Sequence, residues 1–193
     1  MSISLSRSED VARFIEPCRR KASGCARDSF CPRFTLVAVP RVHVTAESTA
    51  SPGQVLEAAR DFSPRRAELW RDVYVEHMTL HDRGETWADV TEGNPWPFGL
   101  VWERLRYDWS EPGTLKGRVI DSNIFRSGST WEIRATPRNA GGSRVEILAV
   151  RDLKGRGWLV WPFFPLGLAR RDVANYLRQF LAKVEATEHD ELA

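Results

Sequence analysis

The sequence predicts an α+β domain in which a curved antiparallel sheet wraps around one long C-terminal helix. The final 30 residues carry apolar side chains at alternating three- and four-residue spacing, the pattern of one face of an amphipathic helix. These residues are Val173, Tyr176, Leu177, Phe180, Leu181 and Val184. Short alternating segments separated by tight turns fill residues 101–153 and indicate antiparallel strands. A sheet and helix of this kind leave space between them, which predicts a cavity for an apolar ligand.

The domain is expected to begin with a strand and two short helices. Over residues 41–47 apolar and polar side chains alternate, as in a half-buried strand. Ser51 and Pro52 then supply an N-cap and a first helical position. Ser63 and Pro64 repeat that signal for a second helix ending near Trp70. The predicted order is therefore strand, helix, helix, followed by a return to strands.

Six further strands are expected before the C-terminal helix. The first two, at residues 73–80 and 86–92, flank a hairpin turn at residues 82–85. Residues 93–99 are expected to form a loop, because they contain two prolines and two glycines. Strands at residues 101–109, 115–125, 129–136 and 144–153 complete a seven-stranded sheet. The long helix spans about residues 165–186.

Composition narrows the classes of function. The 193 residues suffice for one domain with a full core. After residue 41 the chain carries twenty Lys and Arg against twenty-two Asp and Glu, and this near-neutral balance argues against nucleic-acid binding. The three cysteines, all within the first 31 residues, fit neither a disulfide framework nor a paired zinc motif. The longest apolar run, residues 158–169, contains two prolines and is too short to span a bilayer as a helix. We expect a cytoplasmic protein without cofactor or metal; peripheral membrane contact and oligomeric state stay open.

The chain is expected to divide into three parts. Residues 1–38 are rich in Ser, Arg and Cys and lack sustained periodicity, so we expect an extension that is poorly ordered or laid over the surface. Residues 39–187 form the domain, and residues 188–193 form a C-terminal tail.

Four short segments carry a resemblance to a known superfamily. They are Arg41-Val42-His43-Val44 followed by Ser51-Pro52-Gly53-Gln54-Val55, Asp61-Phe62 ahead of Trp70, Gly128-Ser129-Thr130-Trp131, and Ala169-Arg170-Arg171-Asp172. From about residue 41 to 186 the chain resembles the SRPBCC (START-like) superfamily, and within it the polyketide cyclase/dehydrase-like proteins. The resemblance implies the helix-grip fold and a cavity for a lipid, polyketide or other hydrophobic compound. It implies either a carrier or an enzyme.

Hairpin pairing gives an expected inward face. A two-residue turn at residues 127–128 would place Ile124 opposite Trp131 and Ser122 opposite Ile133. A turn at residues 110–113 would set Leu105 against Arg118 and Glu103 against Ile120, and a slip of one residue would reverse these assignments. The candidate ligand-binding residues are Trp96, Phe98, Leu105, Ile120, Ser122, Trp131, Ile133, Ile147, Val173, Tyr176, Leu177 and Phe180. The candidate catalytic residues are Glu103, Tyr107 and Arg118, and no metal ligands are expected.

Several of these residues have two interpretations. Glu103 and Arg118 form either a polar anchor for a ligand carbonyl or carboxylate or a structural ion pair. Trp96 and Phe98 either gate the cavity mouth or fold into the edge of the core. The aromatic residues of the 158–164 segment either seal the opposite end or contact a membrane surface.

Three functions follow from this pattern. The first is binding or carrying of an apolar small molecule in the cavity. The second is a polyketide cyclase or dehydratase-like enzyme that uses the same cavity, with a few polar groups supplying proton transfer. The third is a non-catalytic interaction or stress-associated module with a filled core. A continuous cavity separates the first two from the third.

Overall fold

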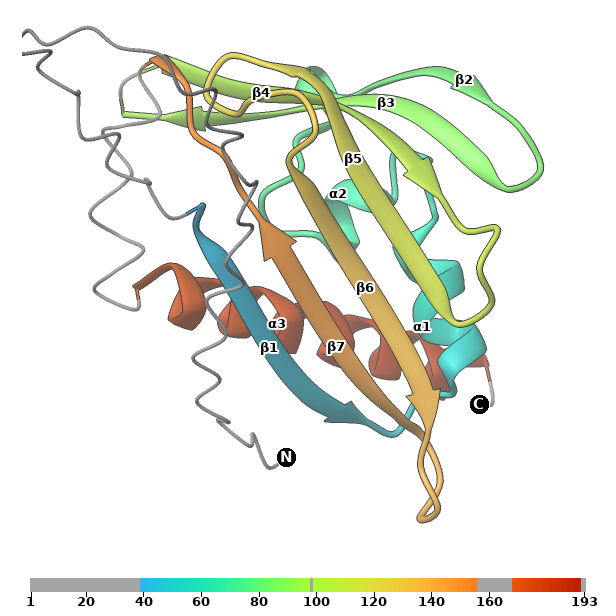
Figure 1. Ribbon diagram of the computed structural model, residues 1–193. Coiled ribbons are helices and arrows are strands. Elements are labelled where there is room, and N and C mark those ends of the chain that lie inside the picture. The colour runs from blue at the N-terminus through green and yellow to red at the C-terminus, as the bar shows by residue number, and fades with distance from the viewer. Residues whose placement is uncertain (1–38, 98, 156–167, 192–193) are drawn as a thin grey trace, which may run out of the picture. The chain divides into compact units, whose positions relative to one another are not determined.

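The computed structural model describes residues 39–97, 99–155 and 168–191. A seven-stranded antiparallel sheet has the order β1-β7-β6-β5-β4-β3-β2 and curves around the helices (Figure 1). The strands are β1 (Arg41–Ser48), β2 (Thr79–Arg83), β3 (Trp87–Trp96), β4 (Gly99–Asp108), β5 (Thr114–Ser122), β6 (Thr130–Pro137) and β7 (Ser143–Val150). The helices are α1 (Pro52–Ala59), α2 (Arg66–Leu69), the 3-10 turn η1 (Val75–His77) and α3 (Leu168–Glu191). The predicted helix-grip fold is confirmed, including two short helices between the first strands.

Local sequence explains the first helix. The Ser51 hydroxyl accepts a hydrogen bond from the Gln54 N–H at 3.3 Å, and the Gln54 side chain accepts one from the Ser51 N–H at 2.8 Å. This reciprocal capping box satisfies two backbone donors that the first turn leaves free. Pro52 adds a fixed φ at the first helical position. Val55 and Ala59 are thereby directed into the core.

The second half of α3 packs directly onto the concave face of the sheet. Its buried residues are Leu177, Phe180, Leu181 and Val184. Phe180 lies parallel to the Trp70 ring, with centroids 3.9 Å apart and an angle of 7° between the planes. Tyr176 also stacks on Trp70, with ring centroids 4.8 Å apart. This aromatic stack sets the distance between α3 and the segment that follows α2, because rings in van der Waals contact cannot approach one another further.

Two expected segments differ from the structure. Most of the expected loop at residues 93–99 is strand: β3 runs to Trp96, β4 begins at Gly99, and Pro95 pairs with Leu100. Pro95 is tolerated because β2 pairs with β3 only as far as Thr79 and Thr91, so that β3 is an edge strand there and needs no N–H on its free side. The strand expected at residues 73–80 becomes η1 followed by β2, which brings His77 against Gly93.

The predicted register of β4, β5 and β6 is wrong. Gly117, and not Ile124, pairs with Trp131. An added Cβ on Gly117 would lie 2.5 Å from the Trp131 ring nitrogen, so the indole needs a glycine opposite it. A bulge in β5 then shifts its pairing with β4, where Leu105 faces Val119 and Glu103 faces Ser122.

The bulge moves two predicted inward residues to the other face. Ile120 is 42% exposed and Arg118 is exposed as well. The inward positions of β5 are Leu115, Gly117 and Val119, with Ser122 returning to the buried side after the bulge. One extra residue reverses the alternation of a strand, and this is the physical reason for the error.

Candidate functional site

The apolar residues in the first half of α3, before Leu177, are at most partly buried, and a cavity of about 840 Å³ lies beneath this half of the helix. Its walls come from one end of the concave face, the segment after α2 and the start of α3. The apolar lining residues are Val42, Val73, Trp96, Val101, Trp102, Ile124, Phe125, Trp131, Ile147, Ala149, Leu168, Ala169 and Val173. This volume falls within the range of about 300–1,000 Å³ that holds drug-sized ligands.

Arg66 forms the most deeply buried polar contact at the cavity wall. Its side chain is 2% exposed, and its Nε donates to Glu92 at 2.6 Å. Its terminal nitrogens donate to the Ala59 carbonyl at 2.7 Å and to the Tyr107 hydroxyl at 3.1 Å. A weaker bond of 3.4 Å reaches the Asp61 carbonyl. Four acceptors therefore hold the guanidinium, as a buried charge requires.

Tyr107 closes this network. Its hydroxyl donates to Glu92 at 3.1 Å while it accepts from Arg66. Burial, together with the charge of Glu92, raises the pKa of Tyr107 well above its ordinary value. The phenol therefore stays protonated at neutral pH and serves as a donor. Burial by itself lowers the pKa of Arg66, but the Glu92 carboxylate together with Tyr107 and Tyr176 outweighs it, and the pKa of Arg66 ends above its usual value.

A second ion pair faces the same cavity. The two terminal nitrogens of Arg151 donate to the Glu103 carboxylate at 2.7 and 3.4 Å. The guanidinium carbon lies 4.6 Å from the centre of the Phe125 ring, within the range of a cation–π contact. Glu103 also lies directly opposite Glu92 in the ladder of β3 and β4. Two carboxylates thus share one position of the ladder, and each has its own arginine.

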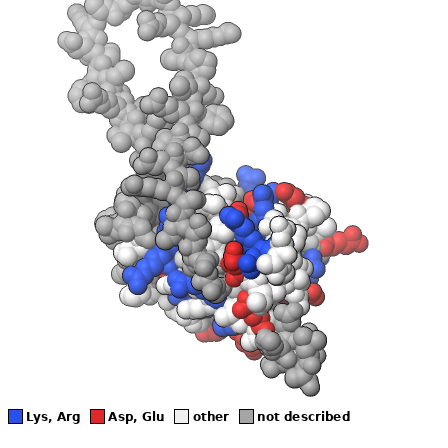
Figure 2. All heavy atoms as spheres, turned by 90° about the horizontal axis from the view of Figure 1, so that it is seen from below, with Lys and Arg blue, Asp and Glu red and all other residues white. Residues whose placement is uncertain are grey.

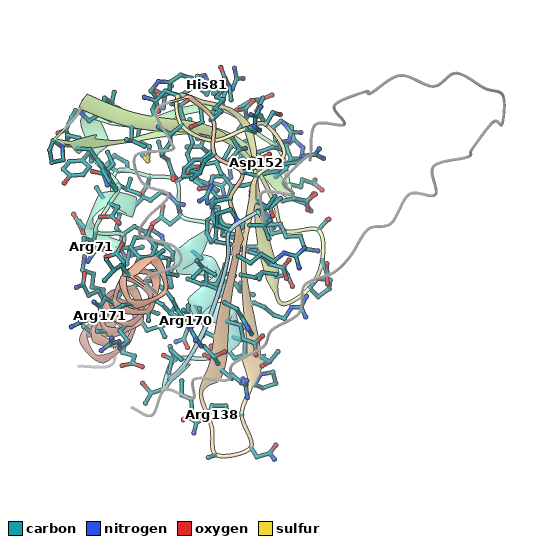
Figure 3. The ribbon with its side chains drawn as sticks, turned by 60° about the vertical axis from the view of Figure 1, so that its left-hand side comes forward. Arg71, His81, Arg138, Asp152, Arg170 and Arg171 are labelled. Atoms are coloured by element: carbon teal, nitrogen blue, oxygen red, sulfur yellow. The ribbon has the colours of Figure 1, made fainter. Side chains whose placement is uncertain are left out.

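A third group of charges lies where the lining reaches the surface. Arg71 follows α2, and it donates to Asp172, in the first turns of α3, at 2.7 Å. It also contacts Asp72 at 3.2 Å. Figure 3 shows Arg71 beside the end of α3 that carries Arg170 and Arg171. All three residues of this ion-pair group line the cavity, and they connect its two sides.

The expected ligand-binding residues divide into four groups. Trp96, Trp131, Ile147, Val173 and Tyr176 line the cavity, as does the candidate catalytic residue Glu103. Leu105, Ser122, Ile133, Leu177 and Phe180 are buried in the core, outside the lining. Ile120 and Arg118 face away on the other side of the sheet, so the predicted Glu103–Arg118 contact is wrong and Arg151 takes that place. Phe98 and the aromatic residues of the 158–164 segment lie outside the described residues.

Sequence reasoning missed Arg66, Glu92 and Arg151. The inward alternation of Ala88 and Val90 continues to Glu92, so this carboxylate could have been found from strand periodicity. Arg66 carries no such signal, because its neighbour Arg65 has the same chemistry and is exposed. Arg151 lies just beyond the end of β7, where alternation no longer fixes direction.

On the face that Figure 2 shows, basic and acidic side chains are interspersed over the described part, and neither sign forms a continuous field. Among the described helices, none combines the length and the apolar character needed to cross a bilayer.

Comparisons with known proteins agree with this architecture. The sequence profile of the family described as "Polyketide cyclase / dehydrase and lipid transport" matches residues 39–187. No curated protein matches the chain significantly.

Solved structures share the fold at low sequence identity. TTHA0849 from Thermus thermophilus gives a TM-score of 0.63 at 16% identity, covering 77% of this chain and 99% of its own. The Zhui aromatase/cyclase from Streptomyces sp. R1128 gives 0.63 at 15% identity, covering 77% and 94%. A START superfamily protein from Mycobacterium smegmatis gives 0.56 at 11% identity, covering 80% and 99%.

Proposed function

The chain belongs to the polyketide cyclase/dehydrase and lipid transport family, and on this premise we propose that it binds and carries an apolar small molecule in the cavity beneath α3. The observation that supports this most directly is the cavity itself. Its volume is about 840 Å³, and its walls are mainly aromatic and aliphatic side chains. A third role expected from the sequence, as a module with a filled core, does not account for such a space.

The lining charges favour carriage over cyclisation. A general acid or base has to be free to exchange a proton with the substrate. The carboxylates that line the cavity are Asp72, Glu92, Glu103 and Asp172. Within the described residues, each of them is held by an arginine at 2.6–3.2 Å. These carboxylates therefore serve to neutralise buried or rim arginines, and a cyclase or dehydratase remains the alternative hypothesis.

One lining hydroxyl is available to a ligand. Tyr176 lines the cavity, and no hydrogen bond of its hydroxyl is found within the described part of the chain. Burial raises the pKa of Tyr176, with Glu92 adding to the effect, so the phenol remains a donor at neutral pH. A ligand oxygen near α3 would find this donor.

Native mass spectrometry of the purified full chain, followed by solvent extraction, tests the proposal. We expect an apolar molecule to leave the protein on extraction. The emptied protein is then titrated with 1-aminoanthracene, an uncharged fluorophore that brightens in apolar surroundings. Saturable binding is the expected result, and a protein that neither carries a molecule nor binds this probe would contradict carriage.

Two variants on one strand locate the binding. Ala149 points into the cavity, whereas its neighbour Leu148 is 41% exposed on the other face. Ala149→Trp should weaken 1-aminoanthracene binding by about tenfold or more, which corresponds to ~1.4 kcal/mol. Leu148→Trp adds an indole on the outside and should leave the affinity unchanged. Equal affinities for the two variants would place the probe elsewhere.

A further inference from the structure

The Glu103–Arg151 ion pair bears on the kind of ligand that the cavity accepts. Resting on the proposed function, we infer that this pair selects apolar ligands with an uncharged hydroxyl or carbonyl oxygen and disfavours carboxylates. Arg151 would donate to the ligand oxygen, and Glu103 would accept from a ligand hydroxyl. The pair would thus act as a specificity-determining contact in the cavity wall.

Within the described residues, Arg151 uses two of its five N–H groups, whereas the more deeply buried Arg66 uses four. Within the described residues, Arg66 makes four hydrogen bonds and is 2% exposed. Arg151 makes side-chain hydrogen bonds only to Glu103 in that part of the chain, and a guanidinium carries five N–H groups. The side chains of Arg151 and Glu103 are 16% and 20% exposed and line the cavity. Of the two deep pairs, the Glu103–Arg151 pair is the one that can accept a new partner.

Packing holds this pair in place before a ligand arrives. The Arg151 guanidinium is bidentate to Glu103 and lies over the Phe125 ring. Such a planar group loses little further freedom when it gains a hydrogen bond. The Phe125 ring against Arg151 is apolar, and Ile124 and Ala149 are further apolar residues of the lining. An oxygenated apolar molecule would therefore be oriented with its oxygen at this pair.

Charge balance argues for an uncharged ligand. Among the described residues, the lining contains the arginines 66, 71, 151 and 171 and an equal number of carboxylates, at residues 72, 92, 103 and 172. A ligand carboxylate at the inner wall would add an uncompensated negative charge beside Glu103 and close to Glu92, its partner on β3. Burying such a charge is costly, because the interior solvates it poorly. A hydroxyl or carbonyl gains the hydrogen bond without this cost.

A matched ligand pair tests the inference. Decan-1-ol and decanoate have chains of the same length and differ in the charge of the head group. Each is used at pH 7.5 to displace 1-aminoanthracene from the emptied full chain. We expect decanol to bind at least about tenfold more tightly than decanoate, a difference of ~1.4 kcal/mol. An apolar wall alone could also make decanol bind more tightly than decanoate. Variants of the ion pair are therefore needed to separate the effect of the wall from the effect of the pair.

Glu103→Gln is the decisive variant. It leaves the Arg151 charge without its counterion, and decanoate should now gain at least about tenfold in affinity, because a carboxylate can replace the lost partner. Decanoate should also raise the melting temperature of this variant. Glu47→Gln is the control, since Glu47 pairs with Arg138 at 3.0 Å outside the cavity lining. No gain for decanoate in Glu103→Gln, or an equal gain in Glu47→Gln, overturns the inference.

A double variant covers the case in which Glu103→Gln does not fold. Replacing both members with leucine, Glu103→Leu with Arg151→Leu, removes the charges together and avoids an unpaired one. Decanol should then bind about tenfold more weakly relative to 1-aminoanthracene. An unchanged ratio overturns the inference. Failure of the wild-type protein to bind 1-aminoanthracene at all would instead contradict the proposed function, so the two failures are distinguishable.

Discussion

Replacing Glu92 with glutamine should destabilise the domain far more than the same change at a nearby ion pair. The substitution removes a counterion from Arg66, whose side chain is 2% exposed. The three remaining hydrogen bonds of that guanidinium, to the carbonyls of Ala59 and Asp61 and to the hydroxyl of Tyr107, are with neutral groups. They cannot offset a full positive charge in the core.

The magnitude follows from the burial of the pair. Breaking a buried ion pair by removing one partner costs about 3–5 kcal/mol. Glutamine can still accept one hydrogen bond from the Arg66 Nε, which places Glu92→Gln near the lower end of that range. With a urea m value of about 1–3 kcal/mol/M, a loss of about 3 kcal/mol moves the unfolding midpoint by at least about 1 M. Equilibrium urea denaturation followed by tryptophan fluorescence measures it.

Asp89→Asn is the matched control on the same strand. Asp89 accepts two hydrogen bonds from Arg104 at 2.7 and 2.8 Å, but the Arg104 side chain is 41% exposed to water. Water therefore solvates the arginine that is left behind, and the loss should be about 1 kcal/mol or less. If Glu92→Gln lowered the stability no more than Asp89→Asn does, the idea that Glu92 stabilises the domain by neutralising the buried charge of Arg66 would be refuted. Replacing Arg66 and Glu92 together with methionine should restore much of the lost stability.

Three further predictions concern stability and pH. Gly53→Ala should stabilise the domain by about 0.5–1 kcal/mol, because Gly53 lies within α1 and the nearest atom to an added Cβ is 4.0 Å away; thermal unfolding measures the gain, and a loss would contradict it. Gly117→Ala should destabilise by about 1–3 kcal/mol, since the new Cβ would meet the Trp131 ring nitrogen at 2.5 Å; an unchanged urea midpoint would refute the close approach. The hydrogen bonds from Arg104 hold the pKa of Asp89 below its ordinary value of 3.8, so Asp89 adds stability above that pH and loses it as pH falls through the lower folded-state pKa. Urea midpoints measured from about pH 6 to about pH 2.5 should accordingly fall less steeply in Asp89→Asn than in the wild type, and parallel curves would contradict this assignment.

The fold could be predicted because its signals are local or periodic. Alternation placed most of the strands, the capping residues Ser51 and Pro52 began α1, and the helical spacing of Leu177 and Phe180 marked α3. The exceptions are instructive. Pro95 and its neighbours carry the composition of a loop, but an edge strand tolerates a proline, and edge position is a property of the sheet rather than of the segment.

The candidate site was predicted only in part, because it depends on register and on long-range pairing. Glu103 was correctly assigned to the face that lines the cavity. Its partner was not predicted, because one bulge in β5 leaves Arg118 facing outward. Arg151, which lies 48 residues after Glu103, makes the ion pair instead. The sequence separation of Glu103 and Arg151 does not predict that contact. Predicting it requires the register of several strands at once.

The face-to-face placement of Glu92 and Glu103 constrains how this part of the protein can change over evolutionary time. Each carboxylate forms an ion pair with an arginine from a distant segment. If either arginine is lost, the two carboxylates repel one another, because they lie opposite each other in the ladder of β3 and β4. A homologue that replaces Arg66 should therefore also have replaced Glu92, and Arg151 and Glu103 should be exchanged as a second unit. Substitutions at these four positions would then occur in pairs of opposite charge. Covariation among homologues would therefore identify the residues of the polar part of the cavity wall.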